Sequence, residues 1–185
     1  MFQLRYQSYY YSTSQALPIL EELPEVAQVA FAFCRDWLAG QETFIQQTSG
    51  STGAPKLQVL SRTQMEASAA ATGAFFGTTT REHLLCCLNP SFIAGKMMLV
   101  RAMVWNCPIT LVEPSANPLL GLEEQFTFVA LVPLQVEAGL AEEKSRKLLQ
   151  SIPHVLIGGA ALPHKIQQGL VQQGIRAWQS FGMTE

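Results

Sequence analysis

TSGSTGAPK is the sequence of residues 48–56, and the interpretation of the rest of the chain starts from this nonapeptide. Glycine at positions 50 and 53 lets the backbone turn and approach a ligand without a Cβ in the way. Four hydroxyl side chains lie among consecutive backbone N–H groups, a combination that holds phosphate oxygens. Lys56 adds a cation, and Pro55 restricts the backbone before it. The nonapeptide therefore predicts a loop that binds the phosphates of a nucleotide.

The flanking residues distinguish this loop from the commoner Walker loop. The pattern G-x-x-x-x-G-K-[ST] would need glycine in place of Pro55 and a hydroxyl in place of Leu57. Residues 42–47 and 57–60 both have the composition of extended strands, so we expect the loop to join two strands rather than to begin a helix. A Ser/Gly/Thr surface turn without a ligand is the alternative interpretation.

The composition indicates one globular domain over residues 1–185, because 48% of the residues are hydrophobic and only 14% are charged. Twelve basic and fourteen acidic residues, with no run of either sign, disfavour nucleic acid or an anionic membrane as a partner. No apolar run reaches the roughly 20 residues that span a bilayer, and the start of the chain does not resemble a signal peptide. We expect a cytoplasmic protein, for which the sequence leaves a homo-oligomer open.

The four cysteines are Cys34, Cys86, Cys87 and Cys107. They show no C-x-x-C spacing, and the adjacent pair lies in an apolar run. We therefore expect buried free thiols rather than metal ligands or disulfides.

Apolar spacing along the chain alternates between helical and strand periods. Residues 1–20 lack a clear period, and we expect them to form a loosely attached leader that, with the next helix, makes up residues 1–41. The predicted helices cover residues 24–40, 61–76, 94–105, 119–125, 133–136, 142–150 and 163–172. The predicted strands of the core, residues 42–185, include 84–88, 109–112, 128–132, 155–157 and 175–179. Short apolar strands separated by helices predict a layered α/β fold, with a mainly parallel sheet and helices on both faces.

Ligands of open α/β sheets bind at the carboxyl ends of the strands, so the segments that follow strands are candidate sites. The first such segment is NPSFIAGK, residues 89–96. The second is GGAALP, residues 158–163, where two glycines leave room for a flat ring and Pro163 suits the first turn of a helix that attracts anions. The third is SFGMTE, residues 180–185. Ordinary connections and a structural tight turn are the alternatives for the first two.

The order of these segments resembles that of the adenylate-forming enzymes, which include acyl-CoA synthetases, luciferases and peptide synthetase adenylation domains. Residues 48–56 resemble the family signature [ST]-[ST]-G-[ST]-[ST]-G-x-P-K, which grips the ATP phosphates. Residues 158–160 resemble the G-G-[AG] segment between adenine and the acyl substrate, and residues 181–185 resemble [YF]-G-x-T-E. The resemblance covers about residues 42–185 and implies the large N-terminal domain of such an enzyme.

The resemblance implies ATP and Mg²⁺ as cofactors, coenzyme A as co-substrate, and a small carboxylic acid as substrate. It assigns catalysis to Lys56, Thr184 and Glu185, with Glu185 also the Mg²⁺ ligand. Phe181 would stack on adenine, and Gly182 would allow close approach. The implied cofactor-binding residues are Thr48, Ser49, Gly50, Ser51, Thr52, Gly53, Lys56, Gly158, Gly159, Ala160, Phe181, Gly182, Met183 and Thr184. The implied acid-binding residues are Phe92, Gly95, Lys96, Gly159 and Ser180, with Phe92 near a position where the family often has histidine.

One subfamily gives a more specific resemblance. FTFVALVPLQV, residues 126–136, is similar to the T-x-x-S-L-V-P-T-Q-L segment of o-succinylbenzoate–CoA ligases of menaquinone biosynthesis. That acid keeps a second carboxylate, whose burial requires a charged or hydrogen-bonding partner. Lys96, at the start of a predicted helix with a favourable dipole, is the expected partner. Arg101 is the second choice, and a solvated surface role for Lys96 is the alternative.

Members of the family continue with a T-G-D aspartate that holds the ribose and with a small C-terminal lid domain that carries a lysine. Residues 1–185 contain no match to either, so we expect a truncated part of a longer ligase that is inactive alone in the complete reaction. A nucleotide-binding module without turnover, or a ligase for another aromatic or fatty acid, is the alternative. A dinucleotide oxidoreductase is disfavoured because no G-x-G-x-x-G follows a strand.

Overall fold

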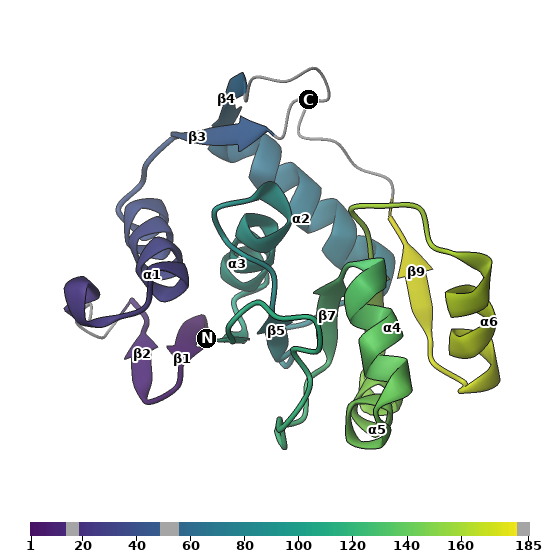
Figure 1. The fold of residues 1–185 in the computed structure, drawn as a ribbon. Helices are drawn as coiled ribbons and strands as arrows, with labels where there is room; N and C mark the ends of the chain where they lie inside the picture. The colour runs from purple at the N-terminus through teal and green to yellow at the C-terminus, as the bar shows by residue number, and fades with distance from the viewer. Residues whose placement is uncertain (14–18, 49–55, 181–185) are drawn as a thin grey trace.

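A seven-stranded sheet forms the centre of the protein (Figure 1). The computed structural model describes residues 1–13, 19–48 and 56–180. All neighbouring strands of this sheet are parallel except β1 and β2. In spatial order the strands are β2 (Tyr9–Tyr11), β1 (Gln3–Tyr6), β6 (Pro108–Leu111), β5 (Leu84–Cys86), β7 (Phe128–Leu131), β8 (His154–Ile157) and β9 (Ala177–Gln179).

Helices cover both faces of the sheet, as the alternating pattern predicted. One face packs against α1 (Glu25–Leu38), α2 (Arg62–Phe76) and α3 (Ile93–Trp105). The other packs against α4 (Pro133–Ala141), α5 (Glu143–Ser151) and α6 (His164–Gln172). Successive strand residues alternate between the two hydrophobic cores, so Leu84 belongs to the first and Leu85 to the second. The predicted layered α/β fold is confirmed.

The amino-terminal segment corrects the expectation of a loose leader. Residues 3–6 form β1, which pairs parallel with β6 in the interior of the sheet, and a 3-10 turn (Leu20–Glu22) precedes α1. Phe2, Leu4 and Tyr6 are buried at every second position, and the Tyr6 hydroxyl donates a hydrogen bond to Glu113 at 2.7 Å. A strand of four residues is too short for its alternation to stand out from the polar residues around it.

A separate two-stranded antiparallel ribbon flanks the nonapeptide. It consists of β3 (Thr43–Thr48) and β4 (Lys56–Ser61), and its last pair joins Thr48 to Lys56. The two predicted strands are therefore confirmed, whereas the loop between them lies outside the described residues. The chain enters α2 directly from β4, and the predicted capping box is present because the Ser61 hydroxyl accepts from the Gln64 backbone N–H while the Gln64 side chain accepts from the Ser61 N–H.

The predicted helix at residues 119–125 is wrong. This segment forms turns that cover the α4 face of the sheet, with Leu119 buried and Gly121 at a φ of +79°. Pro118 and Gly121 both oppose a continuous helix there.

The prediction for the cysteines is confirmed, since all four are buried free thiols. Burial raises the pKa of Cys86 to about 12. Among the described residues, no helix is long and apolar enough to cross a membrane.

The packing of β1 predicts a large stability effect at Leu4, whose side chain is 0% exposed. Leu4→Ala should lower the free energy of unfolding by about 2–5 kcal/mol, because it leaves a cavity in the first core. The matched control is Ile19→Ala, since Ile19 is 63% exposed and lies in the same part of the chain. Urea denaturation measures the free energy of unfolding of both variants. Equal, small effects of the two substitutions would contradict the placement of β1 inside the sheet.

Candidate functional site

The carboxyl edge of the sheet contains a point where neighbouring strands connect to opposite faces. β5 leads into α3 on the first face, whereas the adjacent β7 leads into α4 on the second. In open α/β sheets, ligands bind in the crevice at such a switch point. The described candidate segments, residues 89–96, 158–160 and Ser180, all follow β5, β8 or β9 at this edge.

The turn from β5 into α3 requires glycine at position 95. A Cβ on Gly95 would lie 2.4 Å from the carbonyl oxygen of Asn89 and 2.6 Å from that of Leu88, which is far inside van der Waals contact. The Asn89 side chain also accepts from the Ser91 N–H at 2.8 Å. Phe92 caps α3 with its ring 58% exposed. The packing of this turn thus leaves the Phe92 ring free at the beginning of α3.

Gln46 links this turn to the ribbon that leads to the nonapeptide. Its side-chain amide donates to the Ser91 carbonyl at 2.8 Å, although the two residues are 45 positions apart. Gln46 is buried at the β3 strand that ends at Thr48. The contact therefore holds the expected acid-binding turn against the expected phosphate-binding hairpin. Sequence reasoning missed Gln46, because a single glutamine in a strand carries no recognisable signal.

The structure brings Gly158, Gly159 and Ser180 together, as predicted for one site. The Ser180 N–H donates to the Ile157 carbonyl at 2.8 Å, and its hydroxyl donates to the same oxygen at 3.3 Å. A Cβ on Gly158 would lie 2.6 Å from the Ser180 hydroxyl oxygen. Gly159 has a φ of +82°, a conformation that favours glycine. Together these contacts hold the turn after β8 against the residue that follows β9.

Helix α3 holds two cations, buried Lys96 and half-buried Arg101, that make no ion pair in the part of the chain that the structure describes. Lys96 is 8% exposed, with its ammonium 5.5 Å from the centre of the Phe33 ring. The Arg101 guanidinium lies 5.8 Å from the centre of the Phe128 ring; its Nη1 donates to the Met98 sulfur at 3.6 Å, and its buried Nε has no hydrogen-bond partner. Burial lowers the pKa of both, that of Arg101 to about 10. The solvated alternative for Lys96 is therefore wrong.

The remaining predicted site residues lie outside the described part of the chain. For Thr48 and Lys56 the structure gives the backbone, as the last pair of the ribbon. The others that lie outside are Ser49, Gly50, Ser51, Thr52, Gly53, Phe181, Gly182, Met183, Thr184 and Glu185. Ala160 is described and exposed after β8.

The fold agrees with comparisons to known proteins. The family described as AMP-binding enzyme matches residues 13–185. The chain belongs to this family. A solved structure from Dyadobacter fermentans, described as an acyl-CoA synthetase (AMP-forming)/AMP-acid ligase II-like protein, is 38% identical with a TM-score of 0.82 over 92% of this chain and 48% of that one.

Several relatives are named 2-succinylbenzoate–CoA ligase. The one from Listeria innocua is 26% identical over 89% of this chain and 36% of its own length, and the one from Enterococcus faecalis is 32% identical over 76% and 30%. The o-succinylbenzoate coenzyme A synthetase of Bacillus subtilis, solved with ATP and a magnesium ion, is 25% identical with a TM-score of 0.69 over 76% of this chain and 30% of that one. The chain thus spans about a third of the length of these ligases.

The contact between Gly158 and Ser180 yields a test of the site geometry. Gly158→Ala should lower the free energy of unfolding by about 1–3 kcal/mol, because the new methyl group overlaps the Ser180 hydroxyl. In a Ser180→Ala background the cost should be much smaller, since the overlapping oxygen is gone. A double-mutant cycle measured by urea denaturation gives the coupling. Strictly additive effects would show that the ends of β8 and β9 are not in contact.

Proposed function

We propose that the chain is the amino-terminal part of an ATP-dependent acid–CoA ligase. The observation that carries the proposal is the convergence of two segments at the carboxyl edge beside the β5–β7 switch point. The turn into α3 is held by Gln46 against the ribbon that leads to the nonapeptide, and the glycine segment after β8 packs against Ser180. In such a ligase the substrate carboxylate attacks the α-phosphorus of ATP, giving an acyl-adenylate and pyrophosphate. The thiol of coenzyme A then displaces AMP. Family membership supports the same reaction class.

In this proposal each segment has a separate task. The hydroxyls and N–H groups of residues 48–53 hold the phosphates, and Lys56 reduces the charge on them. The exposed backbone at Gly158 and Gly159 admits the adenylate beside Ser180. Mg²⁺, with Glu185 as its expected ligand, would further neutralise the triphosphate. The chain's own contribution is to hold the acid and the phosphates in one geometry, which removes much of the entropic cost of their encounter.

We further propose that the acid carries a second carboxylate, as o-succinylbenzoate does, and acts in menaquinone biosynthesis. The names of the relatives support this substrate, and so does the buried Lys96 ammonium, which makes no ion pair in the part of the chain that the structure describes. Of the two cations on α3, Lys96 remains the first candidate, because it lies near the beginning of this helix at the carboxyl edge. Arg101 lies five residues beyond Lys96, so the two side chains project about 140° apart. Arg101 faces Phe128, which pairs with the first residues of β5 and β8 at the amino edge, whereas Lys96 faces Phe33 of α1.

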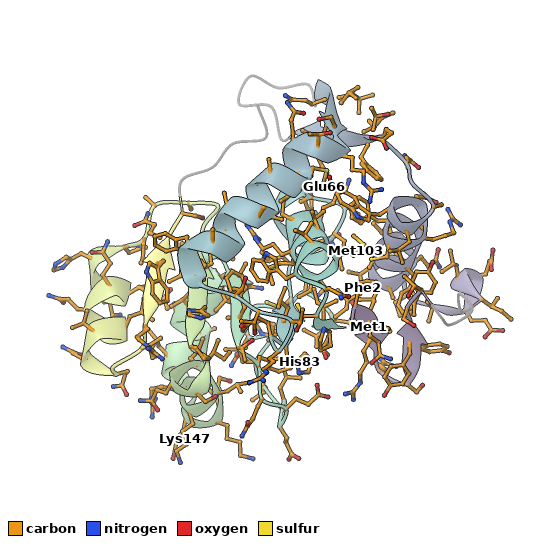
Figure 2. The ribbon with its side chains drawn as sticks, turned by 180° about the vertical axis from the view of Figure 1, so that it is seen from behind. Met1, Phe2, Glu66, His83, Met103 and Lys147 are labelled. Atoms are coloured by element: carbon orange, nitrogen blue, oxygen red, sulfur yellow. The ribbon has the colours of Figure 1, made fainter. Side chains whose placement is uncertain are left out.

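The reaction class is tested by pyrophosphate release from ATP and Mg²⁺ in the full-length enzyme, which should depend on the added acid. Lys56→Ala should lower kcat/KM for ATP about ten- to a hundredfold, because a charge-assisted contact is worth on the order of 1.5 to 3 kcal/mol. Lys147→Ala is the control, since Lys147 is an exposed lysine at the far end of the molecule (Figure 2). Release without acid, or unchanged ATP kinetics in Lys56→Ala, would contradict the proposal.

The substrate proposal is tested by the two cations of α3. Lys96→Ala should raise the KM for o-succinylbenzoate about tenfold or more, from loss of a charge-assisted contact, and should leave the KM for a monocarboxylic aromatic acid nearly unchanged. Arg101→Ala is the paired variant, and the larger diacid-specific effect identifies the cation that meets the second carboxylate. If neither variant discriminates between the diacid and the monoacid, the enzyme acts on another acid.

A further inference from the structure

The ladder between β5 and β7 stops early at the carboxyl edge. These strands pair at Leu84–Phe128 and Leu85–Val129. By contrast, β7 and β8 remain paired as far as Leu131 and Ile157. The two central strands therefore separate where the proposed ligand crevice begins, and their backbone groups there need other hydrogen-bond partners.

Two buried side chains bridge this gap. The Cys87 thiol donates to the Ala130 carbonyl of β7 at 3.5 Å. The other is Gln135, in the first turn of α4, which is 4% exposed. Its Nε2 donates to the Cys87 carbonyl at 3.2 Å and to the Ser115 carbonyl at 3.1 Å. Its Oε1 accepts from the Val132 N–H at 3.1 Å. Gln135 thus uses both N–H groups and its oxygen, and it joins the residues that follow β5 and β7 to the connection that follows β6.

We propose that Gln135 is a positioning residue that sets the width of the β5–β7 crevice and thereby places the turn into α3 against the acid. The inference rests on the proposed function and assigns a task to a residue that touches no reacting atom. Cys87 immediately precedes that turn, so a shift of its carbonyl moves Phe92 and the beginning of α3 with it. A displacement of about 1 Å in a substrate-positioning element can cost a hundredfold in rate.

A simpler role would be to cap α4, because Gln135 is the third helical residue and accepts from Val132. The two roles use different atoms of the side chain. Capping needs only the oxygen, whereas crossing the gap needs the two N–H donors. Gln135→Glu keeps an acceptor for the Val132 N–H but cannot donate to Cys87 or Ser115 while ionised. Gln135→Met is a neutral variant of similar length that removes all three hydrogen bonds.

The matched control lies at the other end of the same two strands. At the amino edge, the His83 N–H donates to the Thr127 hydroxyl at 2.9 Å, and the Thr127 N–H donates to the His83 carbonyl at 2.9 Å. His83 lies well below Glu66 of α2 in Figure 2. Thr127→Val removes the side-chain contact and keeps the backbone one. It therefore loosens the β5–β7 junction away from the proposed crevice.

The experiment combines hydrogen exchange with kinetics in the full-length enzyme. Gln135→Glu and Gln135→Met should both accelerate amide exchange in residues 87–92 and 113–117. Both should raise the KM for the acid about tenfold, with the KM for ATP within about twofold of wild type. Thr127→Val should accelerate exchange only near residues 82–84 and 126–128 and leave both KM values unchanged.

The inference is overturned if Gln135→Glu matches wild type while Gln135→Met does not, because Gln135 would then be a cap of α4 alone. It is also overturned if the acid and ATP constants change together in the Gln135 variants. The exchange measurement needs no turnover, so it decides whether Gln135 closes the gap even if no acid supports pyrophosphate release. Failure of the proposed function is thus distinguishable from failure of the positioning role.

Discussion

The divergence of the chain after β5 and β7 is the constraint on which the rest of this structure depends. Parallel strands must be connected by crossovers, and here two adjacent strands send theirs to opposite faces of the sheet. The carboxyl edge between them cannot be covered by either helix. The ladder ends early at this point, where the Gln135 side chain donates to the Cys87 carbonyl and the Cys87 thiol donates to the Ala130 carbonyl. A crevice with backbone at its rim follows from this topology before any ligand is considered.

The same constraint explains the electrostatics of the first face. Helix α3 begins at the crevice, so its buried side chains lie between the sheet and the helices beside it. The Arg101 guanidinium loses hydration there and gains only the Met98 sulfur and the Phe128 ring as partners, which accounts for its lowered pKa. Such an arrangement costs stability.

Local sequence predicted most of the secondary structure and the edge of the sheet that carries the site. The hairpin around residues 48–56, the capping box at Ser61 and the glycines after β8 each depend on neighbouring residues, and such signals are readable from the chain alone. β1 was not predicted, because its pairing with β6 joins residues about a hundred positions apart. The contacts of Gln46 with Ser91 and of Gln135 with Cys87 could not be predicted either, because the partners lie 45 and 48 positions apart in the sequence. The preference for Lys96 over Arg101 rested on distance along the helix, and the ring contacts of the two cations, with Phe33 and Phe128, do not decide between them.

The most direct measurement of the central claim is a hydrogen-exchange footprint of the full-length enzyme with a non-hydrolysable acyl-adenylate analogue. A suitable analogue joins o-succinylbenzoate to adenosine through a sulfamate in place of the phosphate. We expect slower exchange in residues 88–95 and 156–160, which lie at the carboxyl ends of β5 and β8 and in the segments that follow them. We expect no change at residues 81–83 and 125–127, at the amino edge of β5 and β7. Protection confined to the amino edge, or no protection at saturating analogue, would contradict the assignment of the β5–β7 crevice as the site where the acid and ATP meet.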